Sequence, residues 1–302
     1  MLAKKRNGVE SLTIHDVAAH AGVSSQTVSR VINGSPKVRE STRNRVLEVL
    51  AALKFRPNRM AQNLASRRSN LIGLITYALS DLGPTQVLVR LEEAARDRGF
   101  NVVVIDVKKM VPASIRYAID ELRDQQVAGI QFNLPLRIDF SFLQEIAEQL
   151  PIVTYDVVLG PNIPSVVFKH GAGTRLMTDH LLDLGHKKIA HISGPETWIA
   201  GHLRRVAFVK TLKRRGQVSG PYLQGDWTAD SGYQLASRLL KDYWGKFTSL
   251  MATSDLMALG AMRAFYENGV SVPDEISVVG FSDMPQSAFF QPPLTTVRQD
   301  FA

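Results

Sequence analysis

From residue 70 onward, short apolar runs alternate with longer stretches in which apolar residues recur every three or four positions. The short runs have the length of buried β-strands, and the longer stretches have the period of amphipathic helices. A first series predicts strands at 71–75, 101–106, 127–132 and 152–155, with helices at 86–98, 113–125 and 140–149. A second series predicts strands at 165–168, 188–192, 221–224, 249–253 and 276–280, with helices at 171–185, 198–215, 230–244 and 255–268.

Continuous apolar strands that alternate with helices indicate parallel sheets covered on both faces. Two series in tandem predict two sheets of about five strands each. The expected body is therefore an α/β structure of two lobes with a cleft between them.

Residues 13–54 have a different pattern, which predicts three short helices. Thr13 and Asp16 are spaced as a capping box ahead of the first helix, and Gly22 should end it. Ser24 is a good N-cap for a second helix over 25–32. A third amphipathic helix should end before Pro57, because the residue before proline disfavours helical geometry.

Charge is concentrated in the same part of the chain. The 302 residues carry a formal charge of +8, but residues 1–68 hold 13 Lys and Arg against 4 Asp and Glu. The remaining residues are nearly balanced, with 23 against 24. A basic block on a neutral body favours a nucleic-acid-binding arm, and a solvated basic terminus is the alternative.

Composition excludes several classes of protein. Cysteine is absent, which removes disulfides, zinc ribbons and thiol nucleophiles and fits a reducing cytoplasm. No apolar run of about 18 residues predicts a membrane helix, and the first residues lack the apolar stretch of a secretory signal. We therefore expect a cytoplasmic protein without membrane association.

The second predicted helix begins with Ser25, Gln26 and Thr27, polar side chains that can reach base edges in a major groove. An ordinary helical hairpin with a polar surface is the alternative. In order and spacing, residues 13–33 resemble the DNA-binding head of the lactose and galactose repressor family of bacterial transcriptional regulators. The resemblance predicts a set of DNA-binding residues: Thr13, Ser24, Ser25, Gln26, Thr27, Ser29, Arg30, Asn33, Asn58, Arg59, Gln62 and Leu64.

Residues 56–65 resemble the hinge of that family, which folds as a helix in the minor groove of operator DNA. The residue that matches Leu64 wedges between base steps there and kinks the duplex. Packing of Leu64 against the third head helix is the alternative, and both arrangements can occur in different states.

The resemblance continues through almost the whole body, closest to the lactose-responsive members. It implies an all-α helix-turn-helix head and hinge helix, followed by an α/β periplasmic-binding-protein-like body of two parallel-sheet lobes. The implied boundaries are 1–56 for the head, 57–69 for the hinge and 70–302 for the effector-binding body. Within the body the first lobe takes about 70–160 plus the C-terminal crossover, and the second lobe about 163–293.

The resemblance also predicts a set of effector-binding residues: Asp81, Pro84, Asn133, Asp156, Phe168, Arg204, Trp227, Ser254, Asp283, Gln299 and Phe301, with Gly83 and Val87 beside them. Carboxylate, amide and guanidinium groups around an aromatic face suit a polyhydroxylated sugar. Without the resemblance, Trp227 and Phe168 are equally well explained as core aromatics.

Four positions depart from the lactose-responsive members. Ala200 stands where they have serine, Ser254 where they have asparagine and Ser282 where they have aspartate, although Asp283 follows. These changes remove hydroxyl partners, so a lactose-like effector is not implied. Ser25 replaces a tyrosine and indicates a related but altered operator.

Enzyme motifs are weak. Gly171-Ala172-Gly173 begins a dinucleotide pattern without its third glycine, and no nucleophile elbow or phosphate loop occurs. His180, His186 and His191 lack the spacing of a helical metal pair and are interpreted as surface or strand-end residues. The run 213–215 is expected to cap a helix C-terminus. We expect no catalytic residues, no metal and no cofactor.

The sequence thus predicts a homodimeric repressor that binds operator double-stranded DNA and is released by a galactoside-like sugar. A purine-type corepressor is the alternative ligand, and a free sugar-binding protein is the alternative class. Family members continue with another helix and strand after residue 302. We therefore expect a fragment or truncated reading frame, without the tail-mediated tetramer and with an exposed sheet edge or face in the first lobe.

Overall fold

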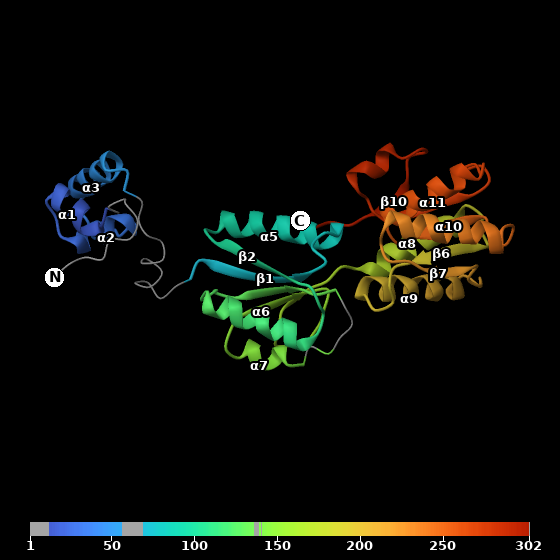
Figure 1. The fold of residues 1–302 in the computed structure, drawn as a ribbon, viewed down its shortest axis with the longest axis horizontal. Helices are drawn as coiled ribbons and strands as arrows, with labels where there is room; N and C mark the ends of the chain where they lie inside the picture. The colour runs from blue at the N-terminus through green and yellow to red at the C-terminus, as the bar shows by residue number, and fades with distance from the viewer. Residues whose placement is uncertain (1–11, 56–68, 136–138, 140, 302) are drawn as a thin grey trace. The chain divides into compact units, whose positions relative to one another are not determined.

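The structure, a computed structural model, describes residues 12–55, 69–135, 139 and 141–301 (Figure 1). The chain divides into two compact units, residues 1–69 and residues 70–302, each of which is considered by itself. No helix within these described ranges is both long enough and apolar enough to cross a membrane.

Within residues 12–55, the first unit has the helices α1 (Ile14–Ala21), α2 (Ser25–Ile32) and α3 (Glu40–Ala52). The predicted capping box is present, because the Asp16 carboxylate accepts from the Thr13 N–H at 2.7 Å and the Thr13 hydroxyl accepts from the Asp16 N–H at 3.4 Å. Gly22 ends α1 in the left-handed conformation, and the Ser24 hydroxyl accepts from the Thr27 N–H at 3.2 Å. The three caps predicted from the sequence are therefore confirmed.

Helix α3 ends at Ala52, before Pro57 as predicted, but proline is not the residue that ends it. Lys54 adopts the left-handed conformation, its N–H bonds to the Ala51 carbonyl and the Phe55 N–H reaches back to the Leu50 carbonyl. This is a Schellman motif, in which a residue just past the helix packs against it. Phe55 lies against the apolar core of the unit, so packing rather than proline ends the helix.

The first lobe of the body is a five-stranded parallel sheet in the order β2-β1-β3-β4-β5. Its strands are β1 (Leu71–Tyr77), β2 (Asn101–Val107), β3 (Ile130–Asn133), β4 (Ile152–Tyr155) and β5 (Ser165–Val166). Its helices are α5 (Leu82–Asp97), α6 (Pro112–Asp124) and α7 (Leu143–Ala147). Helix α5 covers one face of the sheet, and α6 and α7 cover the other (Figure 1).

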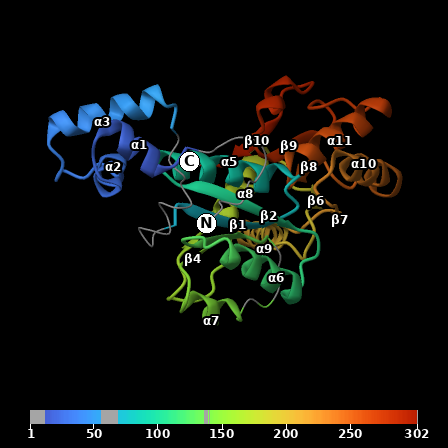
Figure 2. The same ribbon diagram turned by 60° about the vertical axis from the view of Figure 1, so that its left-hand side comes forward.

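The second lobe is a five-stranded parallel sheet in the order β10-β9-β8-β6-β7. Its strands are β6 (Ile189–Ser193), β7 (Tyr222–Gln224), β8 (Ser249–Ala252), β9 (Ser277–Ser282) and β10 (Thr295–Arg298). Its helices are α8 (His170–Asp183), α9 (Ile199–Arg214), α10 (Ala229–Tyr243) and α11 (Asp255–Glu267), with a 3-10 turn at Pro285–Phe289. Helices α8 and α9 cover one face, and α10 and α11 cover the other (Figure 2).

Two strands differ from the sequence prediction. The strand expected at 165–168 in the second series is shorter and joins the first sheet, where the Ser165 hydroxyl bonds to that of Thr154 at 2.8 Å. The fifth strand of the second sheet is β10, which was not predicted because it is a half-exposed segment without an apolar run. Periodicity identifies a strand but carries no information about which sheet it joins.

Two helices of the first lobe also differ from the prediction. Helix α5 begins at Leu82 rather than 86, because Pro84 occupies its first turn, where a missing N–H costs no hydrogen bond. Helix α7 is shorter than the stretch 140–149.

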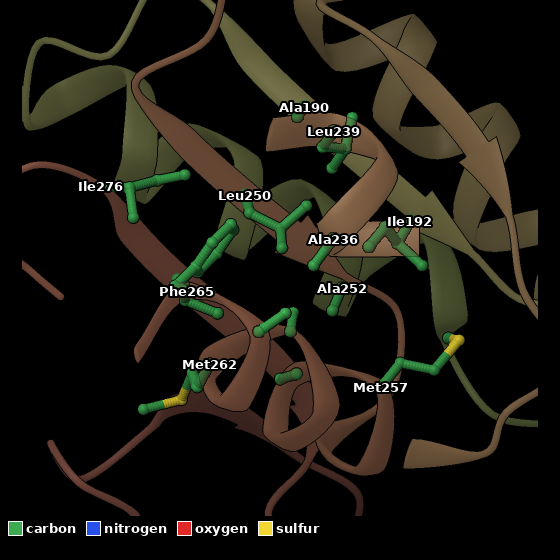
Figure 3. Close-up of a cluster of buried hydrophobic side chains, with 14 of the residues drawn as sticks. Ala190, Ile192, Ala236, Leu239, Leu250, Ala252, Met257, Met262, Phe265 and Ile276 are labelled. Atoms are coloured by element: carbon green, nitrogen blue, oxygen red, sulfur yellow. The ribbon is translucent and has the colours of Figure 1, made fainter. Parts of the chain in front are cut away.

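Strand β6 lies inside the second sheet, and all five of its residues are buried. Ala190 and Ile192 meet side chains of β8, α10 and α11, including Leu250, Ala236 and Phe265, which point toward one another in Figure 3. Ile189 packs on the opposite face with α8 and α9. Burial of both faces explains why the strand is apolar except at His191 and its last residue, Ser193.

The interpretation of His191 as a surface or strand-end residue is wrong, because the side chain is 0% exposed. Its ring packs against Phe208 with centroids 4.4 Å apart and against Tyr222 at 5.8 Å. Neither ring nitrogen has a hydrogen-bond partner within the described residues. Burial, with a contribution from the positive charge of Arg205, lowers the pKa of His191 to about 3.

His191 should make the second lobe sensitive to acid. The unfolded chain takes up this proton near pH 6.5 and the folded chain does not, so folding stability is full above that pH and falls as the pH drops. Below about pH 6.5, this one proton lowers the free energy of unfolding by about 1.4 kcal/mol for each pH unit. Between pH 7 and pH 5 the loss is about 2 kcal/mol. We expect His191→Leu to lose less stability over this range in urea titrations. The exposed control His180→Leu should behave as the wild type, and equal pH dependence of both variants would contradict this origin.

Candidate ligand cavity and nucleic-acid interface

A cavity of about 390 Å³ is lined by residues of both lobes of the body. This volume suits a small organic ligand. Its lining residues are Ser80, Asp81, Leu82, Gly83, Pro84, Asn133, Pro135, Tyr155, Asp156, Phe168, His170, Trp198, Ala200, Arg204, Trp227, Thr228, Ala229, Ser254, Asp255, Leu256, Ser282, Met284, Gln299 and Phe301.

The topology of the sheets explains this position. Asn133, Tyr155 and Ser282 are the last residues of β3, β4 and β9. In parallel sheets the carboxyl ends of the strands and the N-termini of the following helices share one edge, which is where ligands bind. Polar side chains and backbone N–H groups of both lobes therefore meet at the cavity.

Unusual backbone conformations cluster at the same place. Asp156, Trp227 and Ser282 line the cavity and have φ values of +60°, +79° and +143°. Two further residues with positive φ, Ala78 and Asp283, lie within two residues of a lining residue. Each such conformation costs free energy and concentrates where a fold must place a functional group.

A buried polar chain crosses the base of the cavity. The Asp156 carboxylate accepts from the Phe168 N–H at 2.9 Å and meets His170 Nε2 at 2.9 Å. Arg204 Nε donates to His170 Nδ1 at 3.4 Å, and Arg204 Nη1 donates to the Thr253 carbonyl at 2.6 Å. Because Nδ1 accepts from Arg204, Nε2 of His170 carries the proton that is donated to Asp156.

Arg204 is only 4% exposed, and burial lowers its pKa to about 10. It therefore remains charged at neutral pH, with its guanidinium carbon 3.7 Å from the centre of the Phe281 ring. Burial and the neighbouring charge of Asp156 raise the pKa of Tyr155, so its hydroxyl stays protonated.

Aromatic rings form the rest of the wall. Phe168 contacts Phe301 edge-on with centroids 4.9 Å apart. Trp198 contacts Trp227 at 5.8 Å and Tyr77 at 6.1 Å. The indole N–H of Trp227 is buried without a partner among the described residues. An unpartnered buried donor beside a cavity indicates that a ligand or water oxygen completes the site.

Helix α2 of the first unit presents polar residues on one side and buries Val28 and Val31 on the other. Of the predicted DNA-binding residues, Thr13, Ser24, Gln26, Arg30 and Asn33 are exposed. Ser25, Thr27 and Ser29 are partly buried. The Ser25 hydroxyl bonds to His15 Nδ1 at 2.9 Å, which holds the start of α2 against α1.

Both units of the chain match models of known protein families. Residues 13–58 match the model of bacterial regulatory proteins of the lacI family, and residues 178–302 match a periplasmic binding protein-like domain. The lactose operon repressor of Escherichia coli (strain K12) is 38% identical over 97% of this chain and 81% of that protein. The chain belongs to the lacI family. It is a DNA-binding transcriptional regulator, and the fold class predicted from its sequence is confirmed.

Two solved structures of the family cover nearly the whole chain. A lac repressor dimer bound to operator and the anti-inducer ONPF has a TM-score of 0.89 at 38% identity, covering 97% of this chain and 88% of that one. A complex of the transcriptional regulator CelR with cellobiose has a TM-score of 0.67 at 30% identity, covering 96% and 88%.

The structure brings most of the predicted effector residues of this lacI-family chain to the cavity: Asp81, Pro84, Asn133, Asp156, Phe168, Arg204, Trp227, Ser254, Gln299 and Phe301. Their role in binding remains a prediction. Asp283 does not line the cavity, because its left-handed backbone directs it to Arg298, whose Nε donates to the carboxylate at 2.6 Å. Val87 is buried in α5 but is also outside the lining. Asn58, Arg59, Gln62 and Leu64 lie outside the described residues.

Several lining residues were not predicted. Tyr155 and Asp255 directly neighbour predicted residues, and His170 opens a helix, so the strand-end rule could have found all three. Trp198 stands at the start of the helix predicted at 198–215, so the same rule indicated it, but the sequence does not show which way its ring turns. Within the described part of the chain, no group of three His, Asp or Glu side chains could hold a metal ion.

Gly194 leaves the space that the Trp227 ring occupies, because a Cβ at this position would overlap the far ring atoms. We expect Gly194→Ala to displace the ring, shifting its fluorescence to longer wavelength and increasing its quenching by acrylamide. The variant Trp227→Phe identifies the part of the emission that comes from Trp227. In the control Gly171→Ala the added Cβ makes an ordinary 3.7 Å contact with Ala207, so emission should not change. An unchanged spectrum of Gly194→Ala would show that the ring is not held there.

Proposed function

We propose that this lacI-family regulator is a repressor that binds operator DNA as a homodimer and is released by a sugar bound in the cleft. Residues 1–56 are the DNA-binding head, 57–69 the hinge and 70–302 the effector-binding body. The similarity to a lac repressor dimer bound to operator and to a regulator bound to cellobiose supports this proposal. Two heads on one duplex supply the contacts that a single head lacks.

The unpartnered indole N–H of Trp227 at the cavity is the observation that carries the ligand assignment. The face of its ring can stack on the C–H face of a sugar, and its N–H can donate to a ring or hydroxyl oxygen. Asp81, Asn133 and Arg204 add acceptors and donors around it. A galactoside-like sugar uses all of these groups.

The same proposal covers how and where the protein acts. It acts by binding rather than by catalysing a reaction, since its relatives are repressors. Its place is the cytoplasm, where operator DNA is accessible. Leu64 in the hinge wedges between base steps of the operator when the hinge folds on DNA.

Gln26 is exposed near the start of α2 and should contact a base edge. We expect Gln26→Ala to weaken the operator complex by about 1–3 kcal/mol and to relax the choice of base at one position. Titration of labelled operator variants at fixed salt measures this. Asn44→Ala, an exposed change on α3, is the control and should retain full affinity. Unchanged affinity and selectivity of Gln26→Ala would remove α2 from the recognition role.

Arg204 lies in α9 and lines the base of the cavity, so its loss should affect ligand binding and not the DNA-binding head. We expect Arg204→Ala to bind operator normally but to resist release by methyl β-galactoside in gel-shift titrations. Arg205→Ala, a change at the neighbouring and more exposed arginine, should be released like the wild type. Thermal melting confirms that each variant folds. Normal release of Arg204→Ala would contradict the proposed site.

Calorimetry with galactosides and purines separates the ligand alternatives. If addition of a purine tightens operator binding, the protein is a purine-dependent repressor and not a sugar-induced one. A chain that binds sugar but no DNA in the gel shift would instead be a free sugar-binding protein.

A further inference from the structure

Five helices begin at the cavity: α5, α8, α9, α10 and α11 each contribute residues of the N-cap or first turn to its lining. The N-terminus of a helix carries a partial positive charge and unpaired N–H groups, which favour anions. Taken alone, these N-termini would make the cleft a binding site for a phosphorylated sugar.

The chain places its own carboxylates at four of these helix N-termini. Asp81 is the N-cap residue of α5, and Asp255 is the first residue of α11. Asp226 lies two residues before the N-cap of α10, where its carboxylate accepts from the Thr228 N–H at 2.9 Å. Asp156 bonds to His170, the first residue of α8. The field that would attract an anion is therefore already compensated.

Most of these carboxylates are satisfied within the protein. Asp255 is 0% exposed and accepts from the Met284 N–H at 2.9 Å, the Ser287 hydroxyl at 2.8 Å and the Thr296 hydroxyl at 2.5 Å. Asp156 is bonded to His170 and the backbone, as described above. Neither carboxylate needs a ligand to complete its hydrogen bonds.

Asp81 differs from the others. It lines the cavity and is partly buried, but no N–H of the first turn of α5 bonds to its side chain, and Pro84 in that turn has no N–H to offer. The hydrogen bond that its carboxylate accepts from the Ser80 hydroxyl is long, at 3.4 Å. Burial raises the pKa of Asp81, and the negative charge of Asp226 raises it further.

In the lining that the structure describes, no free cation balances this carboxylate. Arg204 is the one Lys or Arg among the described residues of the lining, and its guanidinium is held by Thr253 and His170. A second anion that enters the cavity would therefore meet a carboxylate charge that no cation of the described lining balances. The space is partly desolvated, so the repulsion is stronger there than in water.

We propose that the cleft takes an uncharged sugar and rejects phosphorylated and acidic sugars, and that Asp81 is the residue that sets this selectivity. The inference rests on the proposed sugar-binding function and deepens it. Selection by a like charge against the wrong ligand is a means of specificity that leaves contacts to the correct ligand intact.

Calorimetry on the full chain tests the inference with methyl β-galactoside, galactose 1-phosphate and galactose 6-phosphate. We expect the wild type to bind the neutral galactoside at least about tenfold more tightly than either phosphate, a difference of about 1.4 kcal/mol. In Asp81→Asn the ratio should fall by about threefold or more, because the carboxylate charge is gone while the shape is kept. Added salt should narrow the wild-type ratio as well.

Asp230→Asn is the matched control, since Asp230 lies in the first turn of α10 and is exposed outside the lining. It should retain the wild-type ratio. Asp81→Ser, checked by thermal melting, provides a second neutral variant.

Equal or tighter binding of a sugar phosphate by the wild type, or an unchanged ratio in both Asp81 variants, overturns the inference. If no neutral galactoside binds while operator binding persists, the galactoside effector itself is overturned, and the selectivity of Asp81 with it.

Discussion

The body depends on one buried connection, the chain of hydrogen bonds from Asp156 through His170 to Arg204. Asp156 follows the last residue of β4 in the first lobe, and the other two residues begin or lie in helices of the second. A buried arginine needs acceptors for its donors, and here the Thr253 carbonyl accepts from Nη1 while the His170 ring lies within hydrogen-bond distance of Nε and Nη2. The same bonds fix the Asp156 carboxylate against the Phe168 N–H and so set the shape of the cavity.

The topology of the two parallel sheets determines where a ligand can bind near that connection. Strands end and helices begin at the same edge of each sheet, so both lobes present polar groups and helix N-termini to one space. The strained backbones of Asp156, Trp227 and Ser282 lie at these junctions. They show that the fold gives up local stability there to place a carboxylate, an indole and a hydroxyl.

The sequence was sufficient where local physical rules decide the structure. The capping box at Thr13, the αL glycine at Gly22 and the cap at Ser24 depend on neighbouring residues alone, and all three are present. The alternation of strands and helices was equally readable, because β6 and β8 are buried on both faces and thus mostly apolar.

What depends on tertiary packing was not readable from the sequence. The membership of β5 in the first sheet and the existence of β10 follow from pairing with distant strands. His191 is polar in sequence but lies inside the sheet, and Trp198 reaches the cavity only through the turn before α9. Asp283 was assigned to the cleft by resemblance, but its backbone conformation directs the carboxylate to Arg298.

The net charge of the chain is the sum of two parts with different physical roles. The basic residues of 1–68 belong to the unit that faces phosphate, while the body compensates its helix N-termini with aspartates and is nearly neutral. The two units act as one regulator only if binding in the cleft and binding to DNA are energetically coupled. Such coupling must be reciprocal, because both ligands share one thermodynamic cycle.

Measuring both sides of that cycle is the most direct test. Operator affinity is titrated with and without saturating methyl β-galactoside, and galactoside affinity is measured by calorimetry with and without saturating operator. We expect each ligand to weaken the binding of the other by the same factor, about fivefold or more. A galactoside affinity that is unchanged by bound operator would contradict this expectation.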